Sequence, residues 1–183
     1  ALAFADQIAA QCNVNLELDQ WILPVIDVPE SYTPDSYLRK VAVAGLQANY
    51  GGTVEQERAE KIQQMELEVI SRLGYSSYFL FVKEIRDWSN QHFRSRYRRP
   101  TDCTILRGSA ANSITFYNIG VSDLDPIRYD LYFQRFLNED RASPPDADLD
   151  FAWDEREEVY DYIVNRWGQD RVAVTCTTNH FHR

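Results

Sequence analysis

Apolar residues recur at helical spacing through the first half of the chain. Phe4, Ile8 and Ala9 share one face and predict a helix over residues 3–12. Residues 14–28 alternate weakly, contain a proline, and are typical of an extended connector. The chain is therefore expected to open with a short helix and a connector before its first long helix.

Two long helices come next, each with start and stop signals. Thr33 precedes a proline and an aspartate, which is the pattern of an N-cap and an acidic first turn, and Gly51 stops the helix. Thr53 is expected to cap a second helix over residues 55–72, and Gly74 to end it. Glycine at both ends predicts tight connections between these helices.

The second of these helices carries an apolar stripe at a spacing of three and four residues, formed by Ile62, Met65, Val69 and Leu73. A third helix is predicted over residues 77–91, where apolar and aromatic side chains again recur at helical spacing. These helices are expected to pack around a core supplied by the second half of the chain.

Short strands and helices alternate in that second half. Strands are predicted at Cys103–Leu106, within 143–151 and at Val172–Cys176. A helix over 110–119 and a last helix from Asp154 to Gly168 separate them.

The order strand, helix, strand, helix, strand predicts an α/β (α+β) fold: a small mixed sheet with flanking helices. We assign residues 1–92 to a helical N-terminal part and residues 93–183 to the sheet-containing core.

Three aspartates alternate with apolar residues in the segment that ends at Phe151. In a strand, Asp146, Asp148 and Asp150 line one face, and Mg2+ would relieve their mutual repulsion. Two other interpretations stay open. The face is an ordinary polar strand surface, or the acids together with Glu157 form a calcium loop, although Phe151 stands where that loop needs glycine.

Two further segments carry candidate chemistry. Gly108 and Ser109 stand between a predicted strand and a helix, where backbone N–H groups and a hydroxyl can bind an anion or simply cap the helix. Residues 93–99 contain four arginines and two interleaved aromatics. This basic cluster is either a solvated loop or a contact for a nucleic-acid backbone.

Composition limits the function classes. The 183-residue chain has a net charge of −9, so nucleic-acid binding requires a local basic surface. Three cysteines without metal spacing favour a reducing, cytoplasmic compartment. No apolar run reaches the length of a membrane span, and we expect no signal peptide because the start of the sequence lacks a basic segment. The chain has no initiator methionine, and both ends are expected to be cut points in a longer protein.

Four ordered motifs resemble one family closely. They are Arg107-Gly-Ser-Ala-Ala-Asn-Ser113, Gly120-Val-Ser-Asp-Leu-Asp-Pro126, Tyr132-Phe-Gln-Arg-Phe-Leu-Asn-Glu-Asp-Arg141 and Pro145-Asp-Ala-Asp-Leu-Asp-Phe151. Together with the helix that starts at Glu66, they resemble the palm of the bacterial C-family DNA polymerases. These are the alpha subunits of DNA polymerase III and their error-prone relatives, and the resemblance runs across nearly the whole chain.

The resemblance implies a palm of the beta-type nucleotidyltransferase class. It implies that Gly108 and Ser109 hold the incoming triphosphate, and that Asp146 and Asp148 are the catalytic carboxylates that bind Mg2+. Asp150 matches a third acid that is not usually a catalytic ligand.

The family's pattern also suggests that two arginines neutralise phosphate, namely Arg135 and Arg141. It implies two Mg2+ ions in the full-length enzyme, with primer-template DNA and deoxynucleoside triphosphates as substrates. Replisome subunits such as the sliding clamp are the expected partners, and no membrane is expected.

The chain departs from the family in two respects. Thr104-Ile105-Leu106 replaces the usual Gly-Pro-Gly before the Arg-Gly-Ser segment, and the family's third catalytic aspartate lies beyond Arg183. The forms of the first and last motifs favour the error-prone branch. We expect this part of the palm to be inactive in isolation.

Two alternatives remain. A template-independent nucleotidyltransferase explains the Gly-Ser turn and Asp146 with Asp148, but it does not explain the segments Asp123-Leu-Asp-Pro126 and Phe136-Leu-Asn-Glu139. A non-catalytic scaffold or interaction module that retains the palm fold is favoured by the altered approach at residues 104–106. The full-length gene would discriminate the polymerase from the scaffold: a downstream strand with another aspartate supports the polymerase, and its loss supports the scaffold.

Overall fold

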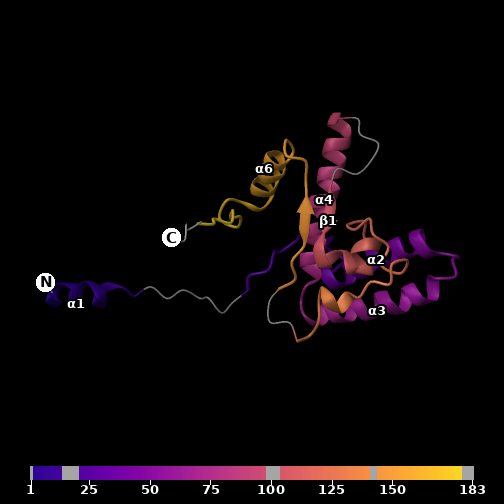
Figure 1. Cartoon of the computed structure of the whole chain (residues 1–183), viewed down its shortest axis with the longest axis horizontal. Coiled ribbons are helices and arrows are strands. Elements are labelled where there is room, and N and C mark those ends of the chain that lie inside the picture. The colour runs from indigo at the N-terminus through magenta and orange to yellow at the C-terminus, as the bar shows by residue number, and fades with distance from the viewer. Residues whose placement is uncertain (1, 14–20, 98–103, 141–143, 179–183) are drawn as a thin grey trace, which may run out of the picture.

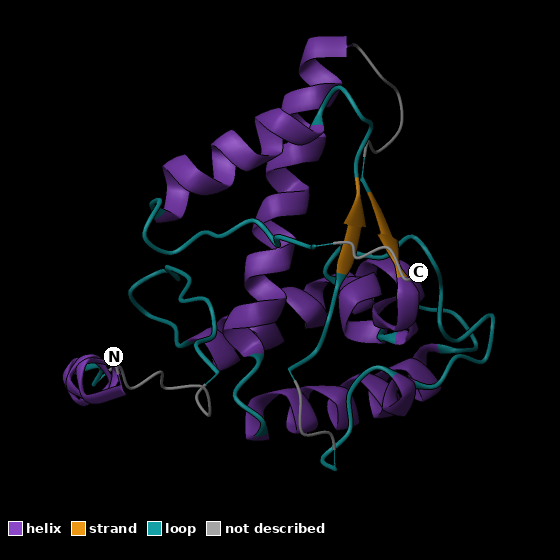
Figure 2. Cartoon of the chain, turned by 60° about the vertical axis from the view of Figure 1, so that its left-hand side comes forward, coloured by secondary structure: helices purple, strands orange, loops and turns teal. Residues whose placement is uncertain are grey.

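The computed structural model describes residues 2–13, 21–97, 104–140 and 144–178, and it is mostly helical with one small sheet (Figures 1 and 2). The elements are, in chain order, α1 (Leu2–Gln11), α2 (Pro34–Tyr50), α3 (Gln56–Arg72), α4 (Ser76–Tyr97), β1 (Ile105–Arg107), the 3-10 helix η1 (Gly108–Asn112), α5 (Ile114–Asn118), the 3-10 helix η2 (Phe133–Arg135), β2 (Asp148–Asp150) and α6 (Arg156–Trp167).

Helix α2 begins and ends where the sequence predicts. The Thr33 hydroxyl accepts a hydrogen bond from the Ser36 backbone N–H, and the Ser36 hydroxyl accepts one from the Thr33 N–H, a reciprocal capping box. Pro34 occupies the first turn, where its missing N–H has no helical partner to lose. The helix ends at Tyr50, directly before Gly51.

Helix α3 differs from the prediction in its start and in its buried face. Thr53 does not cap it: the Thr53 hydroxyl donates to the Tyr50 carbonyl, and Glu55 stands at the N-cap without a side-chain hydrogen bond. The residues of the predicted apolar stripe are only partly buried, at the edge of the interface between α3 and the core. The buried face is instead formed by Ala59, Gln63, Glu66, Leu67 and Ile70, and it includes two polar side chains.

Helix α4 carries the centre of the core. Phe79 stacks on Phe116 with ring centroids 4.1 Å apart, and Phe136 closes the aromatic group. All three rings are fully buried. The helix extends six residues beyond the predicted end at residue 91, because Phe93 on the added turn is fully buried as well.

The sheet is smaller and simpler than predicted. β1 and β2 form an antiparallel pair in the register Ile105↔Asp150, Leu106↔Leu149 and Arg107↔Asp148, so the described residues form a two-stranded antiparallel sheet in place of the mixed sheet that the sequence predicts. Val172–Cys176 forms no strand, because among the described residues it pairs with no other segment and its side chains are mainly exposed. The predicted helix over 110–119 is divided at Ser113 into η1 and α5.

Helix α6 packs on α4 through aromatic rings. Trp88 stacks on Tyr162 with centroids 4.0 Å apart, and Glu84 accepts hydrogen bonds from the Tyr162 hydroxyl and from Arg166. Asp154 does not cap α6, since Glu155 occupies the N-cap position without a side-chain cap bond.

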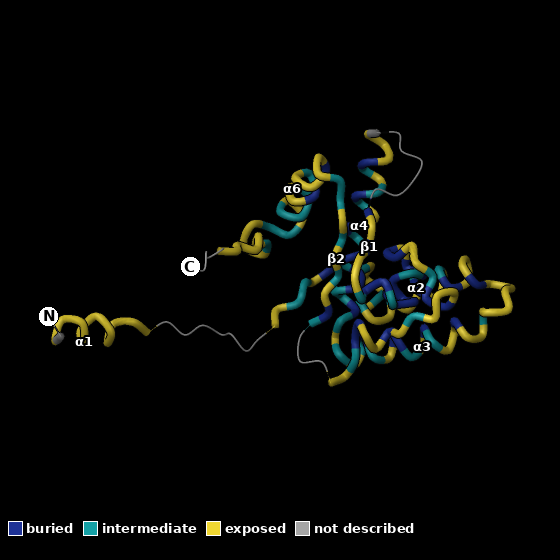
Figure 3. The backbone as a smooth tube through the Cα atoms, viewed as in Figure 1, coloured by how far each residue is buried: buried dark blue, intermediate teal, exposed yellow. Residues whose placement is uncertain are grey.

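Helix α1 lies apart from these elements, and residues 3–11 of it are exposed (Figure 3). Within the part of the chain that the structure describes, no helix is long and apolar enough to cross a membrane.

Candidate functional site

The β1–β2 pair brings the Gly-Ser turn beside the acidic strand. Arg107 pairs with Asp148 across the ladder, and Gly108 follows directly as the first residue of η1. Gly108 has φ of +73°, a left-handed conformation that side chains with a β-carbon rarely adopt. A β-carbon at Gly108 would lie 3.4 Å from Oδ2 of Asp148, so the turn and this carboxylate are close neighbours.

The predicted alternation of the acidic segment is confirmed. Asp146, Asp148 and Asp150 are exposed, whereas Ala147 and Leu149 are half-buried against the main core. Only Asp148 and Asp150 belong to β2, and Asp146 lies two residues before the strand. The calcium-loop interpretation needs residues 146–157 to fold around an ion, whereas Asp148–Asp150, its third to fifth positions, form an extended strand paired with β1.

Arg107 is the cation of this surface. Its Nε lies 2.6 Å from Oδ2 of Asp150, and both side chains are about half exposed. The bond with Asp150 and the nearby charge of Asp148 raise the pKa of the Arg107 guanidinium above its usual value. Asp150 therefore bonds an arginine and is less available to a metal ion than Asp148.

The donor set fits Mg2+ in kind but not in number. Carboxylate oxygens are its preferred protein ligands, and Asp146 and Asp148 both reach solvent. Among the described residues, however, no group of three or more acidic, histidine or cysteine side chains is placed to hold a metal. Two carboxylates leave most positions of an octahedral ion to water or phosphate oxygens.

Of the two arginines predicted to neutralise phosphate, the structure describes one. Arg135 is exposed at the end of η2, and η2 packs against η1, the element that contains Gly108 and Ser109. Arg135 therefore lies on a segment adjacent to the turn. Arg141 lies outside the described residues.

Glu66 is a buried contact of this region that the sequence interpretation missed. The side chain is fully buried, and it accepts hydrogen bonds from the Ser113 hydroxyl and from the backbone N–H groups of Ile114 and Thr115. Burial raises the pKa of the Glu66 carboxyl to about 7, against the opposing effect of its hydrogen bonds. The available signal was its place on the same α3 face as Leu67 and Ile70.

The other end of α5 is also held by polar side chains. The Asn118 amide donates to Oε1 of Gln63 at 2.6 Å and accepts from Asn49 at 3.0 Å. Gly45 of α2 lies against the Asn118 backbone, where a β-carbon would approach the carbonyl oxygen to 1.7 Å. Helices α2 and α3 thus fix both ends of the short helix that follows the Gly-Ser turn.

The aspartates of the Gly120–Pro126 motif are structural anchors. Asp125 accepts hydrogen bonds from the Tyr50 hydroxyl at 2.5 Å and from the backbone N–H of Ile127 at 2.9 Å. Asp123 accepts one from Arg86, whose side chain is fully buried. The motif joins the loop after α5 to α2 and to α4, and neither aspartate faces the acidic strand in these contacts.

The basic cluster is only partly described. Arg96 and His92 both bind the Glu158 carboxylate of α6, which favours a structural role for this end of α4. Arg98 and Arg99 lie outside the described residues. His180 and His182, at the end of the chain, are outside them as well.

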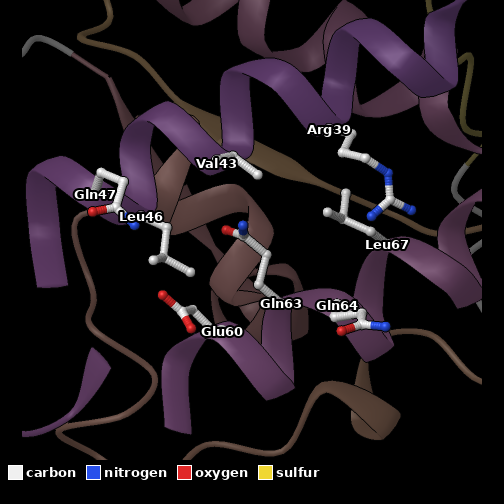
Figure 4. A pocket seen from close by; sticks show the side chains of 8 residues that line it. All are labelled: Arg39, Val43, Leu46, Gln47, Glu60, Gln63, Gln64 and Leu67. Carbon is white, nitrogen blue, oxygen red and sulfur yellow. The ribbon is translucent and has the colours of Figure 1, made fainter. Parts of the chain in front are cut away.

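A pocket of about 250 Å³ opens between α2 and α3 (Figure 4). It is lined by Arg39, Val43, Leu46, Gln47, Glu60, Gln63, Gln64 and Leu67. None of these residues belongs to the Gly-Ser turn or to the acidic strand, so this pocket is separate from the candidate site.

Known proteins resemble the chain along most of its length. The family model described as "Bacterial DNA polymerase III alpha NTPase domain" matches residues 36–183. The chain is 38% identical to an error-prone DNA polymerase of Pseudomonas paraeruginosa, over 99% of this chain and 17% of that protein. It is 38% identical to a DNA polymerase III subunit alpha of Halalkalibacterium halodurans, over 97% of this chain and 15% of that protein.

A third relative is the DNA polymerase III subunit alpha of Aquifex aeolicus, which is 37% identical over 89% of this chain and 14% of that protein. The chain thus spans less than a fifth of the length of these relatives.

Proposed function

This chain belongs to the bacterial DNA polymerase III alpha family, and from that premise we propose that it forms the first part of the catalytic palm of a DNA-directed DNA polymerase. In this proposal residues 93–183 are the palm core and residues 1–92 its helical N-terminal part. The observation that carries the proposal is the register of β1 and β2, which brings Gly108 next to Asp148.

In the proposed nucleotidyl transfer, the Gly-Ser turn binds the triphosphate and the acidic strand binds the metal ions. Gly108 and Ser109 offer backbone donors and a hydroxyl to the triphosphate, because the left-handed glycine leaves the backbone open to close approach. Arg135, on the adjoining 3-10 helix, adds positive charge for the phosphates. Arg141 is proposed for the same role.

Asp146 and Asp148 are the proposed metal ligands. When bound, Mg2+ supplies charge neutralisation at the reacting phosphate and activates the attacking oxygen. The two carboxylates would hold the metal ion beside the turn, while Asp150 forms an ion pair with Arg107 of the neighbouring strand. The chain supplies two carboxylates, and we propose that nucleotide addition requires a further acid from the remainder of the polymerase.

In the intact polymerase we propose primer-template DNA and deoxynucleoside triphosphates as substrates and the sliding clamp as a partner. These assignments follow the names of the relatives and the resemblance of the motifs. A cytoplasmic location is proposed on the same basis. The non-catalytic scaffold remains as the outcome that an absence of nucleotide binding would support.

A titration of the 183-residue chain with a deoxynucleoside triphosphate and Mg2+ tests the proposal. We expect amide NMR signals of Gly108 and Ser109 to shift, and the apparent affinity to fall about tenfold in Asp148→Asn. The control is Asp154→Asn, which removes the same charge at an exposed position outside the site. Unshifted turn signals, or equal affinity in both variants, would contradict nucleotide binding here.

A further inference from the structure

Glu66 occupies a position that ordinary helix packing does not explain. Its carboxylate is fully buried, and both oxygens are engaged: Oε1 accepts from the Ile114 N–H at 3.0 Å, and Oε2 accepts from the Ser113 hydroxyl at 2.7 Å and the Thr115 N–H at 2.9 Å. A buried carboxylate is unfavourable unless its acceptors are satisfied, and here all three donors come from one short segment.

Helix α5 does not require a carboxylate for its cap. The Ser113 hydroxyl already accepts a hydrogen bond from the Phe116 N–H at 3.2 Å, which is the usual arrangement for a serine N-cap. Glu66 accepts hydrogen bonds from the two backbone N–H groups that precede Phe116, and it also accepts one from the Ser113 hydroxyl. The contact thus ties α5 to α3 across 47 to 49 residues of sequence.

The residues that Glu66 holds adjoin the candidate phosphate turn. Helix η1 spans Gly108–Asn112 and Ser113 is the next residue, so the Glu66 contact fixes the C-terminal end of the turn. The N-terminal end is fixed by the ladder pair of Arg107 with Asp148. Between the two ends, Ala110 is fully buried and packs in the main core.

We propose that Glu66 is a positioning residue for the triphosphate-holding turn, acting through Ser113 and the first N–H groups of α5. The proposal rests on the proposed function, because it assigns the turn a ligand to hold. Glu66 touches neither the turn's donors nor Asp148. Glu66 fixes the C-terminal end of the turn, at Ser113, and so helps to set the position of the turn relative to the acidic strand.

Backbone hydrogen exchange and triphosphate titration of the 183-residue chain test the proposal together. Glu66→Gln keeps the side-chain shape but replaces one acceptor oxygen with an N–H2 group, which cannot accept the hydrogen bonds made there. We expect exchange at the amides of residues 109–112 to accelerate at least about tenfold relative to the amides of α2. We expect the triphosphate affinity to fall by about the same factor.

Two controls separate positioning from general stability. Leu67→Ala destabilises the same helix from the neighbouring buried position without touching Ser113. We expect it to raise exchange in α2 and in the turn alike. Glu68→Gln alters an exposed carboxylate that accepts a hydrogen bond from Gln64, and it should behave as the wild type. If Glu66→Gln does not fold, Ser113→Ala removes one of the three donors together with the cap on the Phe116 N–H, and it should still loosen the turn more than α2.

Each outcome decides one question. Selective loosening of the turn in Glu66→Gln supports the positioning role. Loosening in proportion to α2, or the same pattern in Leu67→Ala, overturns it. The exchange measurement needs no ligand, so a wild-type chain that binds no triphosphate refutes the proposed function while the exchange pattern still decides what Glu66 does.

Discussion

At the scale of single residues, Gly108 has three features that define the candidate site: a left-handed backbone conformation, a place directly after β1, and Asp148 as a neighbour. Its φ of +73° is accessible to glycine, and its open side faces Asp148. The sequence predicts a Gly-Ser turn at this place from its position between a strand and a helix. It does not predict the partner, because the distance from residue 108 to residue 148 is set by strand register.

Gly108→Ala is expected to lower the free energy of unfolding by about 1 kcal/mol, because alanine is strained at positive φ. It should also weaken triphosphate binding, since the new methyl group stands 3.4 Å from the Asp148 carboxylate. Urea unfolding measures the first effect and NMR titration the second.

Gly120→Ala is the matched control, since Gly120 has φ of +77° and nothing within 4 Å of its added β-carbon. A similar loss of stability with intact triphosphate binding is expected there. Equal loss of binding in both variants would show that the methyl group at residue 108 acts through stability alone.

Glu66 makes stability depend on pH. Its pKa in the folded chain is about 7, compared with 4.5 as the model value for glutamate, so the folded state binds the proton more tightly. This contribution is fully present below about pH 4.5 and is lost as the pH rises through about 7. The difference in unfolding free energy between wild type and Glu66→Gln should therefore fall by about 3 kcal/mol from about pH 5 to about pH 8.

Chemical denaturation at a series of pH values measures that difference. The exposed Glu68→Gln variant shows how far a glutamate on the same helix contributes by charge alone. If the difference in unfolding free energy between wild type and Glu66→Gln stays constant across this pH range, burial does not raise the pKa of the Glu66 carboxyl.

At the scale of elements, local signals predict helix ends better than they predict buried faces. The start of α2 follows from Thr33 and Pro34, because a cap and a first-turn proline act within a few residues. The apolar pattern does not predict the buried face of α3, because that face includes the polar residues Gln63 and Glu66. Their burial depends on hydrogen bonds with Asn118 and Ser113, which lie far along the chain. Sequence periodicity alone carries no information about such partners.

Gly45→Ala separates intrinsic helix propensity from packing. Propensity predicts that alanine in the middle of α2 stabilises the chain by about 1 kcal/mol. The structure predicts the opposite sign, because the added β-carbon would lie 1.7 Å from the Asn118 carbonyl oxygen. We expect a loss of about 2 to 3 kcal/mol in unfolding free energy, as for an overpacked core.

Thermal and urea unfolding of Gly45→Ala provide the measurement, with Ala44→Gly on the exposed side of α2 as the propensity control. The control should lose about 1 kcal/mol. A stabilised Gly45→Ala chain would show that α2 and α5 can separate without cost.

At the scale of the whole molecule, the sequence predicts the order of the elements, but it does not predict which strands find a strand to pair with. The order β1, α5, β2, α6 follows from residues whose patterns are local. Val172–Cys176 has strand-forming residues, yet a strand exists only when another strand supplies hydrogen bonds. The candidate site was predictable in its Gly-Ser and aspartate residues, while the pairing of Arg107 with Asp150 depended on the register.

Removal of residues 1–13 should leave stability unchanged within about 0.5 kcal/mol, because every side chain described in residues 3–13 is exposed. Val159→Ala gives the contrast at the other end of the chain. Val159 is 3% exposed between α6 and α4, and its truncation should cost about 2 kcal/mol. Urea unfolding of both variants tests whether α1 belongs to the cooperative unit, and a large loss on deletion would place it there.

Primer extension tests the proposed palm in its full context. The chain alone should add no nucleotides, because its described residues assemble no group of three metal-binding side chains. Placed in the matching region of the Pseudomonas paraeruginosa error-prone polymerase, to which it is 38% identical, the chain should support extension. Asp148→Asn in that chimera should abolish extension, while Asp154→Asn retains it, because only Asp148 adjoins the Gly-Ser turn. A folded chimera that binds DNA but adds no nucleotide would favour the scaffold, and extension by the isolated chain would show that two carboxylates suffice.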